Sequence, residues 1–146
     1  MRKRYGFIGM MVVALTLLFA SCDKMFINGD LDGMWRLTGA TYSDSTATVG
    51  NVYYSFQRHL VKIGYDSDEK IPHQMMEYHI GAFTHNGDTL VVKGFRHYLH
   101  EEIASSKEEL RKFYLFEDST RFVVERLGDE KMVLKSDSAR LFFTKW

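Results

Sequence analysis

Apolar and polar residues alternate through most of the chain beyond residue 33, and this pattern predicts short β-strands. The clearest case is the segment 77–82, where the apolar side chains occupy every second position. Asn86-Gly87 follows, and alternation resumes over 90–93. Asn-Gly between two alternating segments predicts a hairpin with a type I′ turn, since both residues tolerate a positive φ. In this register Tyr78 faces the core and His79 faces solvent.

The same reasoning predicts strands in the other β-rich segments. These segments are 35–42, 52–65 with a bend at Gln57-Arg58, 121–127, 132–136 and 140–145. One helix is predicted to begin after Ser106, because Glu109 stands at the position that completes a capping box. Leu110 and Phe113 then share one face of this helix with Tyr114.

About eight antiparallel strands, with one short helix before the C-terminal strands, predict an all-β fold. We expect a small up-and-down β-barrel, because closure removes the exposed edges of so aromatic a set of strands. A β-sandwich is the alternative. An eight-stranded barrel has an interior that side chains fill or that holds one small ligand.

The first 22 residues follow a different pattern. Arg2, Lys3 and Arg4 precede an apolar stretch at 7–19, and Ala20-Ser21 leads to Cys22. This is the layout of a secretory signal peptide, and about 13 apolar residues fall short of the roughly 20 that span a membrane. The segment 17–22 resembles the lipobox of bacterial lipoproteins. The alternatives are ordinary secretion, which leaves an unpaired thiol, and a retained anchor.

The lipobox resemblance implies that residues 1–21 are removed and that Cys22 becomes acylated, with palmitate among its lipids. We therefore expect a lipid-anchored protein of the cell envelope, at the outer membrane. Residues 22–32 form a turn-prone tether and 33–146 a single domain. Removing three basic residues leaves 16 against 19 acidic ones, a net charge near −3. This charge gives no reason to bind nucleic acid.

Gly33-Met34-Trp35 stands at the start of the first predicted strand. With the segment 53–57 and the closing pattern at 122–136, it resembles the lipocalin and wider calycin group, particularly the short lipocalin-like lipoproteins of Bacteroidetes. The resemblance implies a Trp that closes the barrel floor under a cation from the last strand. Antiparallel closure makes Lys145 the better partner for Trp35 and Arg140 the poorer one, with a contribution of about 0.5–2 kcal/mol.

Two functions follow from the predicted barrel, both without catalysis or a cofactor. In the first, the interior binds a small apolar or amphipathic molecule; the alternative for the same side chains is plain core packing. The candidate ligand residues are the core-side aromatic and methionine side chains Tyr54, Phe56, Met76, Tyr78, Phe122 and Phe143. In the second, the barrel is solid and its outer surface engages an envelope protein or polysaccharide. Tyr53, Phe83 and Phe95 are expected on that surface.

Candidate chemistry elsewhere is sparse. His97 and His100 lie close to Glu101 in the sequence, but nothing elsewhere supplies an obvious fourth zinc ligand. The sequence contains no Gly-x-Ser-x-Gly elbow, no His-Glu-x-x-His motif and no phosphate-binding glycine loop. We therefore expect neither a metal site nor an enzyme, and the sequence does not identify a particular protein partner.

Overall fold

The computed structural model describes residues 27–65 and 77–146. The predicted signal peptide, Cys22 and Met76 lie outside these described residues. The elements are η1 (Gly29–Leu31), β1 (Gly33–Tyr42), β2 (Ser45–Thr48), β3 (Val52–Gln57), β4 (Leu60–Tyr65), β5 (Tyr78–Asn86), β6 (Thr89–His97), α2 (Lys107–Arg111), β7 (Ser119–Leu127), β8 (Lys131–Lys135) and β9 (Ala139–Lys145).

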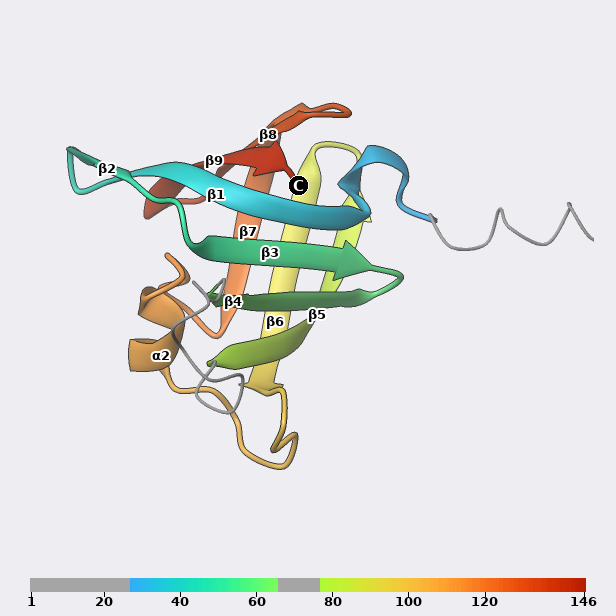
Figure 1. Ribbon diagram of the computed structural model, residues 1–146, viewed down its shortest axis with the longest axis vertical. Coiled ribbons are helices and arrows are strands. Elements are labelled where there is room, and N and C mark those ends of the chain that lie inside the picture. Colours follow the sequence, from blue (N-terminus) through green and yellow to red (C-terminus); the bar gives the residue numbers. More distant parts are fainter. Residues whose placement is uncertain (1–26, 66–76) are drawn as a thin grey trace, which may run out of the picture.

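Eight of these strands form a closed antiparallel barrel, as predicted (Figure 1). From β3 to β9 each strand pairs with the next, and β1 pairs with β3 on one side and with β9 on the other. The alternation in the sequence accounts for this architecture because the strands of the barrel turn their apolar side chains toward its interior. The predicted bend at Gln57-Arg58 is the tight turn between β3 and β4, where Gln57 pairs with Leu60.

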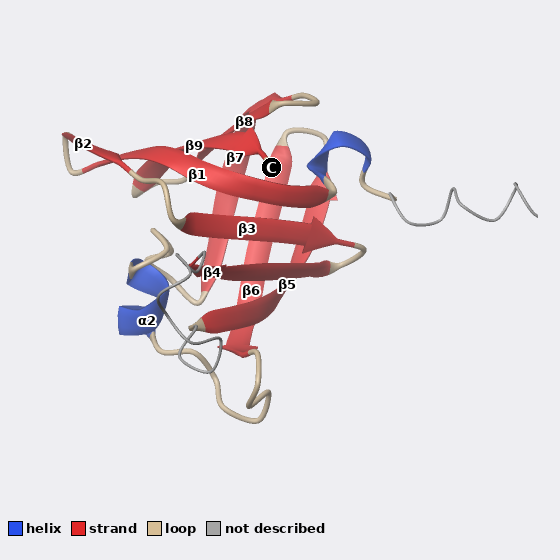
Figure 2. Ribbon diagram, viewed as in Figure 1, coloured by secondary structure: helices blue, strands red, loops and turns tan. Residues whose placement is uncertain are grey.

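Strand β2 is an addition to the barrel that the sequence did not predict. It pairs only with the second half of β1, through a hairpin in which Ser43 and Asp44 both have a positive φ. These two residues tolerate that conformation less readily than Asn-Gly, so the turn carries a weak sequence signal. Figure 2 shows β2 projecting beyond the barrel wall.

The two helices lie at opposite ends of β3 and β4 (Figure 1). The short helix α2 has the predicted capping box, in which the Ser106 side chain accepts from the Glu109 amide and Glu109 accepts from Ser106. At the other end η1 buries Leu31 completely. Asn28 donates to both Asp32 and the carbonyl of Arg58 there, so the described end of the expected tether packs against the barrel.

The predicted register of β5 is wrong by one residue. His79, Gly81 and Phe83 face inward, whereas Tyr78 is part-exposed on the outer face. The interior selects this register because Phe83 supplies a large ring and Gly81 leaves room for Phe95, whose ring would lie 2.9 Å from a Cβ at that position. Hydrogen bonds satisfy the imidazole of His79, which removes the main cost of burying it.

Phe83 and Phe95 were expected on the outer surface, and both are in the core. The parity of β6 changes at Gly94, which has φ +67 and forms a bulge where the pairing with β5 shifts between Ile80 and Ala82. A bulge adds one residue to one strand and so reverses which face the following side chains occupy. Phe95 and Val92 therefore both point inward, although residues three positions apart face opposite sides of a regular strand.

Candidate functional site

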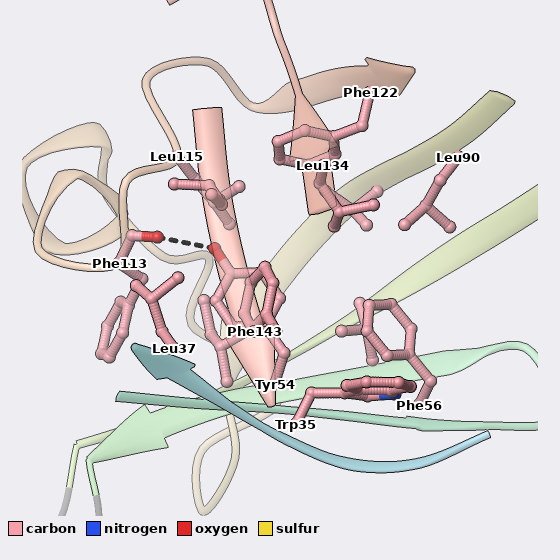
Figure 3. Close-up of a cluster of buried hydrophobic side chains, with 14 of the residues drawn as sticks. Trp35, Leu37, Tyr54, Phe56, Leu90, Phe113, Leu115, Phe122, Leu134 and Phe143 are labelled. Atoms are coloured by element: carbon pink, nitrogen blue, oxygen red, sulfur yellow. Dashed lines mark hydrogen bonds between the residues drawn. The ribbon is translucent and has the colours of Figure 1, made fainter. Parts of the chain in front are cut away.

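Four of the six candidate ligand residues meet inside the barrel. Tyr54, Phe56, Phe122 and Phe143 are each at most 2% exposed. The ring centroids of Tyr54 and Phe143 lie 5.1 Å apart in an edge-to-face contact (Figure 3). Such spacing is that of aromatic side chains in a packed core. Of the other two candidates, Met76 lies outside the described residues and Tyr78 is on the outer face.

The interior also has a polar tie to the end cap. The Tyr54 hydroxyl donates a 2.6 Å hydrogen bond to the carbonyl oxygen of Phe113, just after α2 (Figure 3). Burial raises the pKa of this phenol far above its usual range, so it stays a donor. The Phe113 ring itself is fully buried and lies 4.9 Å from that of Tyr65. Side chains therefore plug the α2 end of the barrel.

Trp35 closes the opposite end. Its indole is fully buried and Nε1 donates to the Leu31 carbonyl at 2.8 Å. Lys145 places Nζ 4.9 Å from the indole centroid, so the expected cation–aromatic contact is present. Arg140 lies elsewhere: it pairs with Glu125 at 2.6 Å. Gly33, with φ +119, lets the Lys145 stem pass, because a Cβ there would lie 3.1 Å from Lys145 Cε.

Two hollows lie on the outer wall of the barrel, and a third lies between the segments 116–121 and 136–138. The first two share Ser55 and Lys62 and so make one continuous depression, which we call the outer groove. Their volumes are about 150 and 470 Å³. The outer groove is lined by Met34, Tyr53, Ser55, Gln57, Arg58, Leu60, Lys62, Ile63, Gly64, Tyr65, Tyr78, Ile80, Tyr98 and Trp146. None of the buried rings of Tyr54, Phe56, Phe122 and Phe143 lines it.

Small residues form the floor of the outer groove. Cross-strand pairing puts Tyr53 beside Gly64 and Gly64 beside Tyr78, while Ser55 pairs with Lys62. A Cβ at Gly64 would overlap the Tyr78 ring, so glycine is needed for that ring to lie across the sheet. The outer groove is thus a depression between aromatic side chains on either side.

Two aromatic pairs form the walls, and each carries a cation. Trp146 packs edge-to-face on Tyr53 at 5.5 Å, and the Arg36 guanidinium lies 5.6 Å from the Trp146 ring. Across the groove Tyr78 and Tyr98 have centroids 6.3 Å apart. Lys62 Nζ lies 5.0 and 5.3 Å from these two rings. Trp146 is 69% exposed and Tyr98 43%, which leaves both open to a partner.

A polar cluster links α2 to the barrel and was not foreseen from the sequence. Buried His79 has Nδ1 2.7 Å from Ser105 Oγ and Nε2 3.3 Å from Glu77 Oε1. Lys112 donates to Glu77 at 2.9 Å. Desolvation lowers the pKa of His79, against the opposing effect of Glu77. The only signal in the sequence was that His79, Gly81 and Phe83 occupy alternate positions and so lie on the same face of one strand.

The Ser105–His79–Glu77 arrangement has the residue types of a hydrolase triad, but the backbone amides of Ser105 and Ser106 already donate hydrogen bonds elsewhere. An acyl-transfer site needs donors aimed at a developing oxyanion. The amide of Ser105 donates to the Phe95 carbonyl, and the amide of Ser106 donates to Glu109. Both neighbouring amides are therefore engaged, and the cluster acts as a tie between α2 and β5. The described residues contain no group of three metal-binding side chains.

The barrel, its Gly-x-Trp entrance and its C-terminal hairpin define a lipocalin-like domain, and the chain belongs to that family: the model of the lipocalin-like domain family matches residues 17–146. No curated protein matches the sequence. Within the described residues, no helix has the length and apolar character needed to cross a membrane.

Two solved structures share the fold. A lipocalin-like protein from Bacteroides uniformis superposes with a TM-score of 0.64 at 21% identity, covering 81% of this chain and all of that one. An uncharacterized protein from Bacteroides eggerthii gives a TM-score of 0.62, also at 21% identity, covering 80% of this chain and 99% of that one. At this identity the likeness extends to the fold alone.

Proposed function

We propose that this chain is a lipid-anchored lipoprotein of the bacterial cell envelope whose barrel is solid and acts, without catalysis, through its outer surface. The lipobox at 17–22 supports the anchor and Cys22 is its site of attachment. Lipid attachment places the domain at a membrane surface independently of its own charge, because acyl chains supply the affinity.

The observation that carries the choice of the outer surface is the packing of the interior. Trp35 fills one end, Phe113 the other, and the rings of Tyr54, Phe56 and Phe143 occupy the space between. Burial of such rings stabilises the fold by about 1.5–3 kcal/mol each. A molecule that entered the barrel would have to displace them. Internal ligand binding is therefore the second candidate, since none of these buried rings lines the two hollows of the outer groove.

Native mass spectrometry of the full chain, extracted in mild detergent from its source, tests this proposal. We expect the mass of the polypeptide with its acyl chains and no further molecule. A non-covalent apolar ligand, released when the barrel unfolds, would favour the internal site instead. The Phe143→Ala variant provides a positive control, because deletion of a buried ring leaves a cavity that binds benzene in an apolar core. Benzene should stabilise this variant and leave the parent unchanged.

A further inference from the structure

The charge of the outer groove differs from that of the domain around it. Its lining includes Lys62 and Arg58, and Arg36 lies over the Trp146 ring at its edge. No acidic side chain lines it among the described residues. The chain beyond residue 21 nevertheless has 19 acidic residues against 16 basic ones. Cations gathered on a protein with a net negative charge favour an anionic ligand in this groove.

The shape and side chains of the outer groove favour a sugar over a peptide strand or a membrane surface as its ligand. Barrel closure pairs β3, β4 and β5 on both sides, so a peptide has no open strand edge to join here. A membrane surface fits protruding side chains better than a depression with Ser55 and Gly64 at its floor. Sugar rings, in contrast, present C–H groups to aromatic side chains and hydroxyls to polar ones. The larger hollow, about 470 Å³, has the size of a small-molecule site.

We propose that the outer groove binds an acidic polysaccharide. Its anionic groups pair with Lys62 and Arg58, and its sugar rings pack against the exposed side chains of Trp146 and Tyr98. This inference rests on the proposed function, in which the barrel is solid and acts through its outer surface. It adds the class of ligand that this surface binds. The two hollows joined at Ser55 and Lys62 would hold successive sugar units of one chain.

Lys62 is the centre of the proposed site. It is the cation common to both hollows, and it lies over the rings of both Tyr78 and Tyr98. An anion bound there meets a charge held in place by two aromatic rings. Charge-assisted hydrogen bonds to such a group are stronger than those between neutral partners. Binding should also weaken as salt concentration rises, since the groove is exposed.

Binding of defined polymers to the full chain in detergent tests the proposal. The acidic probes are polygalacturonate, with carboxylates, and chondroitin sulfate, which adds sulfates; dextran is the neutral comparison. Binding of either acidic probe in preference to dextran is expected. The Lys62→Met variant should weaken it about tenfold, the effect of one charge-assisted contact. Trp146→Ala and Tyr98→Ala should each weaken it several-fold, since each removes one apolar contact surface.

Matched variants separate this site from general attraction of a polyanion. Lys135→Met removes an exposed lysine of β8, and Leu99→Ala removes a 70% exposed side chain beside Tyr98. Neither lines the outer groove, and neither should change binding. Equal losses for Lys62→Met and Lys135→Met would overturn the proposal, as would equally tight binding of poly-L-glutamate. Circular dichroism spectra identical to the parent's would show that the variants are folded.

The other outcomes also decide between the two proposals. Binding of dextran alone, lost in Trp146→Ala, would overturn the acidic class and keep an outer-surface function. Binding of phosphatidylglycerol vesicles by a chain that ignores every polymer would make the groove a membrane contact and overturn the polysaccharide. Absence of all binding, together with an apolar molecule in the native mass spectrum, would overturn both proposals.

Discussion

The ammonium of Lys145 lies 4.9 Å from the centroid of the Trp35 indole and donates a 2.8 Å hydrogen bond to the carbonyl of Asp30. One side chain of the last strand thus joins the first strand to the turn that precedes it. The contact fixes the seam of the barrel and the cap over Trp35 together. Its position makes it a test of what holds this end closed.

Replacing Lys145 with Met keeps an unbranched apolar stem and removes the charge. We expect the free energy of unfolding to fall by about 1–2 kcal/mol, from the lost cation–aromatic attraction and hydrogen bond. Urea denaturation measures the change. Arg140→Met is the matched control, because its exposed pair with Glu125 contributes about 0–1 kcal/mol. A larger loss of unfolding free energy in Arg140→Met than in Lys145→Met would show that Lys145 is not the cation that closes the barrel.

Gly33→Ala should destabilise the same end by a different route. The backbone at residue 33 has φ +119, a conformation that alanine adopts with strain, and the new Cβ would lie 3.1 Å from Lys145 Cε. We expect a loss of about 1–3 kcal/mol, the usual cost of backbone strain. Gly50→Ala has open space and no positive φ, so its stability should equal the parent's. Equal stability of the two variants would contradict the role given to Gly33.

Tyr54→Phe removes a hydroxyl from the packed interior while keeping the ring. The carbonyl of Phe113 then loses its 2.6 Å donor in a buried setting, which costs about 1–3 kcal/mol. Thermal or urea unfolding checks this value. Tyr42→Phe serves for comparison, since Tyr42 is 43% exposed and its ring contacts with Tyr114 and Phe116 would remain. If both changes have the same small effect, the α2 cap does not depend on this bond.

His79 should make stability depend on pH. Burial lowers its pKa below the usual 6.5, so between the two values the unfolded chain binds more protons than the folded one. Stability is then full above about pH 6.5 and falls as pH decreases through that value toward the lowered pKa. The neighbouring groups are Glu77, Ser105 and His97, with Glu109 beyond His97.

Urea denaturation between pH 5 and 7.5 measures this dependence. His79→Gln should be less stable at pH 7.5 but should lose the part of the slope near pH 6 that arises from His79. His100→Gln, which removes an imidazole with 68% side-chain exposure, is the matched control and should keep the parent's slope. An unaltered slope in His79→Gln would place the titrating group elsewhere.

Cys22→Ala tests the anchor. Metabolic labelling with radioactive palmitate should mark the parent chain and fail to mark this variant, because the thiol that receives the lipid is gone. Ser21→Ala keeps a small residue before the cysteine and should remain labelled. Labelling of Cys22→Ala at the parent's level would refute the lipoprotein assignment, whatever the barrel proves to bind.

Local signals predicted the elements of this fold well. The capping box of Ser106 and Glu109 involves residues three positions apart, and it is present as predicted. The predicted hairpin is also present, because Asn86 pairs with Thr89, but its two turn residues are Gly87 and Asp88. Gly87 has φ +59 and Asn86 does not have a positive φ, so the type I′ turn predicted over Asn86-Gly87 is wrong. Closure was predicted from a succession of short antiparallel strands whose aromatic edges would otherwise be exposed. The resemblance to lipocalins implied a cation over Trp35, and antiparallel closure then made Lys145 the better candidate.

Which faces of β5 and β6 point inward depends on packing between strands, and the local sequence pattern does not contain this information. The bulge at Gly94 reverses which side chains of β6 face inward. The space for the Phe95 ring comes from Gly81 on the neighbouring strand β5. The outer groove was missed for the same reason, because Tyr78 was assigned to the interior. The outer face of β5 carries the apolar side chains of Tyr78 and Ile80, so these two residues resembled core residues in the sequence. The cluster around His79 joins segments 26 residues apart and left no sequence motif.

Closure by β1 and β9 also constrains the order in which the protein folds. Trp35 pairs with Lys145, so one edge of the first strand stays unpaired until the last strand joins it. Contacts this distant in sequence form slowly, since the loop between them must be ordered first. Until then β1 presents unpaired backbone groups of the kind that promote aggregation. The folding barrel is therefore vulnerable until the seven-residue strand β9 has paired with β1.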